Sequence, residues 1–174
     1  MSKVVYLNGS FVDYAEAVVP VEDRGFLFAD GVYEAVRFYG RKPFALEEHL
    51  ARLRRSAEAI KLGGLPSTQE LMDAALETVA RNECLDAVLY LQVTRGSAPR
   101  KHEFPASHTP STVFMIAREV PRPGAQRVSH GVPCITVSDI RWHRCDIKSI
   151  ALLPNVLAKQ QAAEAGAAEA IFVR

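Results

Sequence analysis

One stretch of the chain has the period of an α-helix, and it constrains the fold more than any other feature. Between residues 46 and 60, apolar side chains recur at steps of four, three, four and three, which puts them on one helical face. These residues are Leu46, Leu50, Leu53, Ala57 and Ile60. The pair Gly63-Gly64 ends this helix, and the capping-box pattern Ser67-Thr68-Gln69-Glu70 begins another that runs to about Asn82. The sequence therefore predicts two consecutive helices.

Segments rich in β-branched and aromatic residues flank the helix pair and predict β-strands. Asn8-Gly9 can supply the two positive φ angles of a type I′ turn, which predicts a hairpin over residues 4–12. Further turns are expected at residues 23–25 and 30–31. Three more strands are expected before and after the helices, at residues 32–39, 87–94 and 112–118.

A long loop separates the last two of these strands. Residues 96–111 contain three prolines and the cationic run Arg100-Lys101-His102. Loops of this length are uncommon in compact domains and are usually functional or disordered. The charged run favours a functional loop, and a plain solvated loop is the alternative.

A proline-rich segment marks a predicted domain boundary after residue 120. We expect an N-terminal domain over 1–120, a linker over 121–126 and a second domain over 127–174. The second domain has a predicted strand at 132–137, a helix at 154–165 and a strand at 168–173. Two strands and one helix are too few to close a core, so this domain is expected to be incomplete.

The composition excludes several classes of function. The 174 residues are 48% hydrophobic with a net charge of +1, which fits a globular chain without the positive excess of a nucleic-acid-binding protein. No apolar run reaches the ~20 residues of a membrane span, and the first residues reach a turn too early for a signal peptide. Three unpatterned cysteines favour a reducing compartment. We therefore expect a cytoplasmic protein that contacts neither nucleic acid nor membrane.

Lys148 is the first candidate for chemistry. It lies between Ile147 and Ile150, just before Leu152-Leu153. Apolar surroundings disfavour the charged form of an amine and make it a usable nucleophile or base, as a Schiff-base lysine requires. The alternative is a lysine whose amine simply reaches solvent from a strand edge. A metal site is not expected, because the histidines and cysteines between residues 130 and 145 lack zinc-ligand spacing.

Two further residues could bind a ligand. Arg52 lies at the edge of the apolar helix face, with His49 three residues before it, and a guanidinium there could bind a phosphate. The alternative is an exposed member of a basic cluster. Tyr33 has a phenol that could bind a substrate or could simply pack in the fold.

The order of these motifs resembles the fold-type IV pyridoxal-phosphate enzymes, and among them the D-amino-acid transaminases. The resemblance covers essentially the whole chain. It implies an α+β, two-domain fold, with an N-terminal α/β sandwich followed by the first part of an α/β pseudo-barrel. The motifs that carry it are Glu22-Asp23-Arg24-Gly25, Asp30-Gly31-Val32-Tyr33-Glu34, His49-Leu50-Ala51-Arg52-Leu53, Val93-Thr94-Arg95-Gly96, the loop around Arg100-Lys101-His102, and Arg144-Cys145-Asp146-Ile147-Lys148-Ser149 with Asn155-Val156-Leu157-Ala158-Lys159-Gln160.

The resemblance also implies roles for particular residues. Lys148 would bind pyridoxal 5'-phosphate as an internal aldimine, and Arg52 would bind the cofactor phosphate. Tyr33, Arg100 and His102 would hold the substrate carboxylate, with the Arg100–His102 loop supplied by the partner subunit of a homodimer. Glu34 is given no role.

The expected reaction is transamination between a D-amino acid, such as D-alanine, and a 2-oxo acid, such as 2-oxoglutarate or pyruvate. Branched-chain aminotransferases and aminodeoxychorismate lyases are alternatives because they share the lysine segment. The resemblance implies that both lack the combined Arg100 and His102 loop, so that loop discriminates between them and the D-amino-acid enzymes. A non-catalytic folding or dimerisation module is a third. Members of the family continue beyond the position of Arg174, where a glutamate and Ser/Thr-rich turns complete the cofactor site. We therefore expect this chain to be a fragment.

Overall fold

The computed structural model describes residues 3–174, which form two compact units. The first unit runs to Pro121 and includes Asp146–Ile150, and the second comprises Arg122–Cys145 and Ala151–Arg174. Met1 and Ser2, with which the predicted first domain begins, lie outside the described residues. The segment that carries Lys148 therefore packs with the first unit, although the predicted linear boundaries put it in the second domain. The domain limits themselves remain a prediction.

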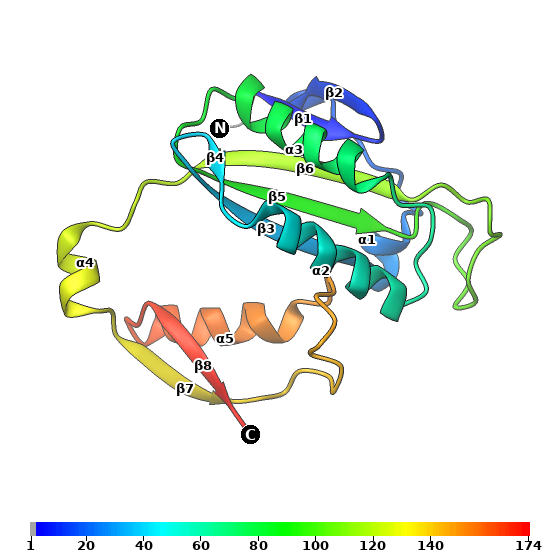
Figure 1. Cartoon of the computed structure of the whole chain (residues 1–174). Coiled ribbons are helices and arrows are strands. Elements are labelled where there is room, and N and C mark those ends of the chain that lie inside the picture. Colours follow the sequence, from blue (N-terminus) through cyan, green and yellow to red (C-terminus); the bar gives the residue numbers. More distant parts are fainter. Residues whose placement is uncertain (1–2) are drawn as a thin grey trace. The chain divides into compact units, whose positions relative to one another are not determined.

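The first unit is built on a six-stranded antiparallel sheet with strand order β2-β1-β6-β5-β3-β4 (Figure 1). Asn8 and Gly9 join the first two strands with φ angles of 49° and 90°, so the predicted hairpin is confirmed. The other strands predicted in this unit are confirmed to within one residue, whereas the strand predicted at 132–137 begins two residues later, at Cys134. The strands are β1 (Val4–Leu7), β2 (Ser10–Asp13), β3 (Gly31–Tyr39), β4 (Lys42–Pro43), β5 (Ala87–Thr94) and β6 (Thr112–Glu119).

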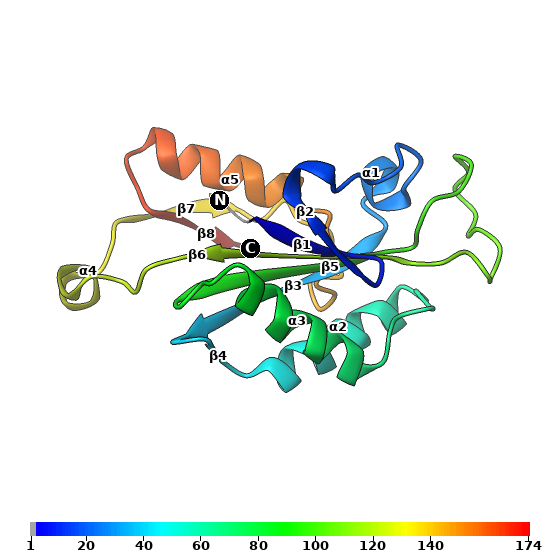
Figure 2. The same ribbon diagram turned by 90° about the horizontal axis from the view of Figure 1, so that it is seen from above.

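Two helices, α2 (Leu46–Ala59) and α3 (Thr68–Arg81), cover one face of this sheet (Figure 2). The predicted apolar face of α2 lies in the core, where Leu50 and Leu53 are fully buried against strand residues such as Val36 and Leu89. The capping box is also confirmed: Ser67 accepts from the Glu70 N–H, and the Glu70 carboxylate accepts from the Ser67 N–H. The helix pair and the sheet thus form the core of this unit.

A short helix, α1 (Arg24–Phe28), replaces the turn predicted at residues 23–25. Asp23 caps it by accepting from the Gly25 N–H, and its other oxygen accepts from the hydroxyls of Thr94 and Thr112. Five residues are too few for a helical period to appear in the sequence, so the prediction missed this element. A single 3₁₀ turn, η1 (Tyr14–Glu16), lies between β2 and α1.

The second unit contains a parallel strand pair joined through a helix. Strands β7 (Cys134–Ser138) and β8 (Glu169–Val173) pair in register from Cys134 opposite Glu169, and α5 (Leu153–Glu164) connects them. Helix α4 (Ala125–His130) begins inside the predicted linker. No helix within residues 3–174 is long and apolar enough to cross a membrane.

Replacing Ser67 with Ala should lower the free energy of unfolding of the first unit by about 1 kcal/mol, because the first turn of α3 loses its cap. Chemical denaturation followed by circular dichroism measures the change. Ser107→Ala, in an exposed turn, is the matched control. An equal effect of the two substitutions would contradict a capping role.

Candidate functional site

The lysine segment lies along the open edge of β3. The short strand β4 pairs only with Phe38 and Tyr39, which leaves the first half of β3 without a strand neighbour on that side. Residues 147–150 pair there instead: Tyr33 donates its N–H to the Lys148 carbonyl at 3.0 Å, and Ile150 donates to the Gly31 carbonyl at 3.1 Å. Backbone pairing thus fixes the position of Lys148 on the sheet.

Two close contacts secure this edge pairing. Ile147 is buried in the core of the first unit. Gly31 has no side chain at a point where a Cβ would lie 2.6 Å from the Val93 carbonyl oxygen and 3.0 Å from Ile150 Cδ1. A larger residue at position 31 would therefore collide with the backbone of β5 at Val93, and the Ile150 side chain would also have to move.

The Lys148 side chain is half-buried and lies on an aromatic ring. Its Nζ is 3.9 Å from the ring centroid of Tyr33, in the geometry of a cation–π contact. The Lys148 N–H donates to Ser56 Oγ at 3.2 Å, and Ser56 lies one helical turn after Arg52 on α2. Among residues 3–174, no carboxylate pairs with the Lys148 amine. The structure therefore brings Lys148, Tyr33 and the Arg52 face of α2 into one region.

A buried carboxylate organises Arg52. Glu34 on β3 is completely buried and accepts from Arg52 Nε at 2.6 Å and from Nη2 at 2.7 Å. His49 Nδ1 lies 2.7 Å from the same carboxylate and, because a carboxylate can only accept, donates its proton to it. The guanidinium and the imidazole are thus oriented by a single acid.

Arg52 and His49 stabilise the negative charge of Glu34. Burial tends to raise the pKa of Glu34, but hydrogen bonds from Arg52 and His49 and their charges outweigh burial and lower the pKa below its ordinary value of 4.5. The hydrogen bond to Glu34 in turn raises the pKa of Arg52. Both groups are therefore ionised at neutral pH.

Arg52 keeps part of its guanidinium available. Its side chain is 46% exposed, and within residues 3–174 its Nη1 has no hydrogen-bond partner. A fixed, half-exposed guanidinium with free N–H groups is suited to an anion such as a phosphate. A lysine amine and an arginine with a free N–H group therefore both lie beside the first half of β3.

Glu34 is the residue that sequence reasoning missed. It falls in the same alternation as Val32, Val36 and Phe38, the core-facing residues of β3. A charge in that phase of a strand must find a buried partner. A charged residue at a core-facing position of a predicted strand was therefore the sequence signal that could have identified Glu34.

Tyr33 points to the opposite side of β3 from Glu34. Its ring stacks on Tyr90 at 5.5 Å, and Phe114 follows at 6.4 Å from Tyr90. Burial, with a smaller effect of Tyr33, raises the pKa of Tyr90 to about 12. The Tyr90 hydroxyl therefore stays protonated and donates to Gln92 Oε1 at 2.7 Å. Lys148 lies at the Tyr33 end of this aromatic row.

The structure does not bring Arg100 and His102 to the other candidate residues. Both are exposed, and both lie against Phe28: the Arg100 guanidinium carbon is 5.1 Å from the ring centroid, and the His102 ring is 5.5 Å away. Within residues 3–174, no contact joins either side chain to Tyr33 or Lys148. In the same part of the chain, no group of three or more His, Cys, Asp or Glu is placed to hold a metal.

Replacing Glu34 with Gln should lower the free energy of unfolding by about 1–3 kcal/mol at pH 7, because a charge-assisted acceptor is lost. The lowered pKa means that ionised Glu34 stabilises the fold above pH 4.5 and loses this effect as the pH falls through its folded-state value. The difference between the two proteins should therefore shrink below about pH 4.5. Denaturation curves between pH 7 and pH 3 measure it.

Glu58→Gln, on an exposed position of α2, is the control and should leave stability nearly unchanged at every pH. A difference between wild type and Glu34→Gln that stayed constant down to pH 3 would show that the charge of Glu34 contributes nothing.

A model of the class IV aminotransferases matches residues 31–174. The D-alanine aminotransferase of Bacillus licheniformis is 47% identical over 171 residues, which cover 98% of this chain and 59% of that protein. The D-alanine aminotransferase of Staphylococcus haemolyticus is 44% identical over 167 residues, covering 96% of this chain and 59% of the relative. The chain thus spans about three fifths of the length of the curated relatives it matches.

Solved structures share the fold. The T.th. branched-chain amino acid aminotransferase with pyridoxamine 5'-phosphate is 27% identical and has a TM-score of 0.89, covering 99% of this chain and 60% of that one. A fold IV transaminase from Curtobacterium pusillum is 24% identical with a TM-score of 0.77, covering 98% of this chain and 63% of that one. These matches confirm the predicted fold of the fold-type IV enzymes, of which this chain contains about three fifths.

Proposed function

The chain belongs to the class IV aminotransferases, and on that premise we propose that the whole protein transfers amino groups between a D-amino acid and a 2-oxo acid with pyridoxal 5'-phosphate. The observation that carries this proposal is the lysine segment held on the edge of β3, with its amine over Tyr33. The preference for a D-amino acid rests on the identity of 47% and 44% to two D-alanine aminotransferases. D-Alanine, 2-oxoglutarate and pyruvate are the substrates to test first.

Lys148 is the residue that would hold the cofactor covalently. Its backbone is fixed by β3 and Ser56, and the neighbour of its amine is an aromatic face rather than a carboxylate, so no ion pair has to break before the amine reacts. The bound cofactor supplies an electron sink that allows the Cα–H bond of an amino acid to break. The Lys148 amine would be the base that removes the Cα proton and returns it.

Arg52 would bind the cofactor phosphate through the part of its guanidinium that Glu34 leaves free. Glu34 and His49 prevent the guanidinium from turning, so the N–H groups of Arg52 are oriented before the anion arrives. Pre-orientation lowers the entropy that binding would otherwise cost.

Arg100 and His102, with Tyr33, would hold the substrate carboxylate. Two cationic side chains in one exposed loop suit a carboxylate, and neither contacts the Lys148 region within the first unit. We propose that the loop serves the site of a second copy of the protein, which requires a homodimer.

The three cysteines are free, which is consistent with the proposed cytoplasmic location.

The branched-chain aminotransferase is the second candidate, because solved enzymes of that name share the fold at 27% identity. The Arg100 and His102 loop and the higher identity to D-alanine aminotransferases favour the first candidate. An aminodeoxychorismate lyase and a non-catalytic dimerisation module remain as outcomes of the tests below.

Replacing Lys148 with Ala should abolish the covalent attachment of pyridoxal phosphate that borohydride makes permanent, because the attacking amine is lost. Peptide mass spectrometry after reduction locates the label. Lys42→Ala, which removes an exposed amine on β4, should leave labelling unchanged. Full labelling of the Lys148→Ala variant would assign the site to another lysine, and absence of labelling in the unaltered protein would favour the non-catalytic module.

Replacing Arg100 with Ala should lower kcat/KM for D-alanine by about tenfold to a hundredfold, which corresponds to a charge-assisted contact of about 1.5–3 kcal/mol. Amines without a carboxylate should be affected far less. Lys101→Ala, the neighbouring exposed cation, is the matched control. Equal losses for both kinds of amine would mean that Arg100 serves folding or dimerisation.

A further inference from the structure

We propose that Arg24 is a positioning residue for the loop that carries Arg100 and His102: its buried guanidinium holds the loop backbone, so that the two side chains are presented in a fixed direction. The inference rests on the proposed carboxylate-binding role of that loop.

Arg24 binds the loop through its backbone carbonyls. Arg24 is the first residue of the short helix α1, and only 4% of it is exposed. Nη1 donates to the carbonyls of Lys101 at 2.7 Å and Glu103 at 3.3 Å, and Nη2 donates to that of His102 at 3.4 Å. Three consecutive residues of the loop are therefore bound to one side chain.

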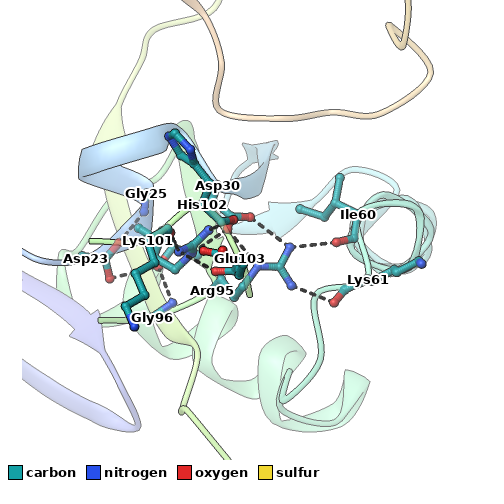
Figure 3. Close-up of polar contacts among 12 residues, drawn as sticks. Asp23, Gly25, Asp30, Ile60, Lys61, Arg95, Gly96, Lys101, His102 and Glu103 are labelled. Carbon is teal, nitrogen blue, oxygen red and sulfur yellow. Dashed lines mark hydrogen bonds and ion pairs between the residues drawn. The ribbon is translucent and has the colours of Figure 1, made fainter. Parts of the chain in front are cut away.

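Asp30 keeps the guanidinium in place. Its carboxylate accepts from Arg24 Nε at 2.9 Å. It also accepts from Arg95 Nε at 2.8 Å, a contact that Figure 3 shows. Burial tends to raise the pKa of Asp30, but the hydrogen bonds and charges of Arg95 and Arg24 lower it below its ordinary value of 3.8. Asp30 is thus ionised at neutral pH and anchors both arginines.

Arg95 ties this group to the end of α2. It donates to the carbonyls of Ile60 and Lys61, each at 2.7 Å. These carbonyls lie at the negative end of the helix dipole, where a cation is favoured. The Arg24–Asp30–Arg95 cluster therefore connects the cationic loop to the helix that carries Arg52.

Phe28 sets the direction of the side chains. It lies on α1 with Arg24, and its ring contacts the guanidinium groups of both Arg24 and Arg100 and the ring of His102. Arg24 fixes the loop backbone, and Phe28 supports the two side chains that leave it. The binding geometry of the loop is thus set by a single short helix.

Limited trypsin digestion of the chain tests the backbone contact without any cofactor. Arg24→Lys keeps a cation beside Asp30, but a single ammonium cannot reach three carbonyls. Cleavage after Arg100 and Lys101 should become at least about tenfold faster, while cleavage after Arg127, in the second unit, should not change. Arg24→Gln is the second variant. Arg95 still neutralises Asp30 in both, so neither leaves a buried charge unpaired.

Arg54→Lys is the matched control. Arg54 also binds a loop carbonyl, that of Pro66, and donates to Thr68 Oγ1. This substitution should leave cleavage after Arg100 unchanged. Unchanged cleavage in both Arg24 variants would overturn the inference and would leave the proposed role of Arg100 intact.

Steady-state kinetics of the cofactor-loaded protein test the consequence for binding. Arg24→Lys should raise KM for D-alanine about tenfold with a smaller change in kcat, and an amine without a carboxylate should show no such rise. Faster cleavage with an unchanged KM would contradict the carboxylate-binding role of the loop, and with it the positioning role of Arg24. Equal losses for both kinds of amine would reduce Arg24 to a stabilising residue.

Discussion

The pairing of residues 147–150 with the open edge of β3 is the interaction on which the candidate site depends. An unpaired strand edge leaves N–H and C=O groups without partners, and here the lysine segment satisfies them at Gly31 and Tyr33. The same pairing places the Lys148 side chain on Tyr33 and its backbone N–H on Ser56 of α2. A segment far along the sequence thus becomes part of the first unit.

Two carboxylates, the fully buried Glu34 and the partly buried Asp30, organise the cations around this edge. Glu34 orients Arg52 from the core side of β3, and Asp30 holds Arg24 and Arg95 at the start of the same strand. Burying an ionised carboxylate is costly unless it is paired and hydrogen-bonded. Each of these acids has two cationic or imidazole partners, so the cost is offset and the arginines gain fixed directions. Each acid thus orients the cations that it binds.

The two sides of β3 therefore have different tasks. The side facing α2 holds the charged group of Glu34, His49 and Arg52, whereas the opposite side presents the ring of Tyr33, stacked on Tyr90. A strand can do this because successive side chains point to opposite faces. Lys148 lies at the strand edge between these two sides. Its backbone N–H contacts Ser56 on the α2 side, and its amine lies over Tyr33 on the opposite side.

The sequence by itself determined the helix pair, the hairpin and the principal strands, because each depends on a local period or on turn residues such as Asn8 and Gly9. Local residue chemistry singled out Lys148 and Arg52 as candidates, and the resemblance to a family gave each a role toward the cofactor. Only the tertiary structure decided that Lys148 pairs with β3, that Glu34 is the partner of Arg52, and that α1 holds the cationic loop. These three depend on contacts between residues distant in sequence, and no local pattern encodes which buried charge meets which partner.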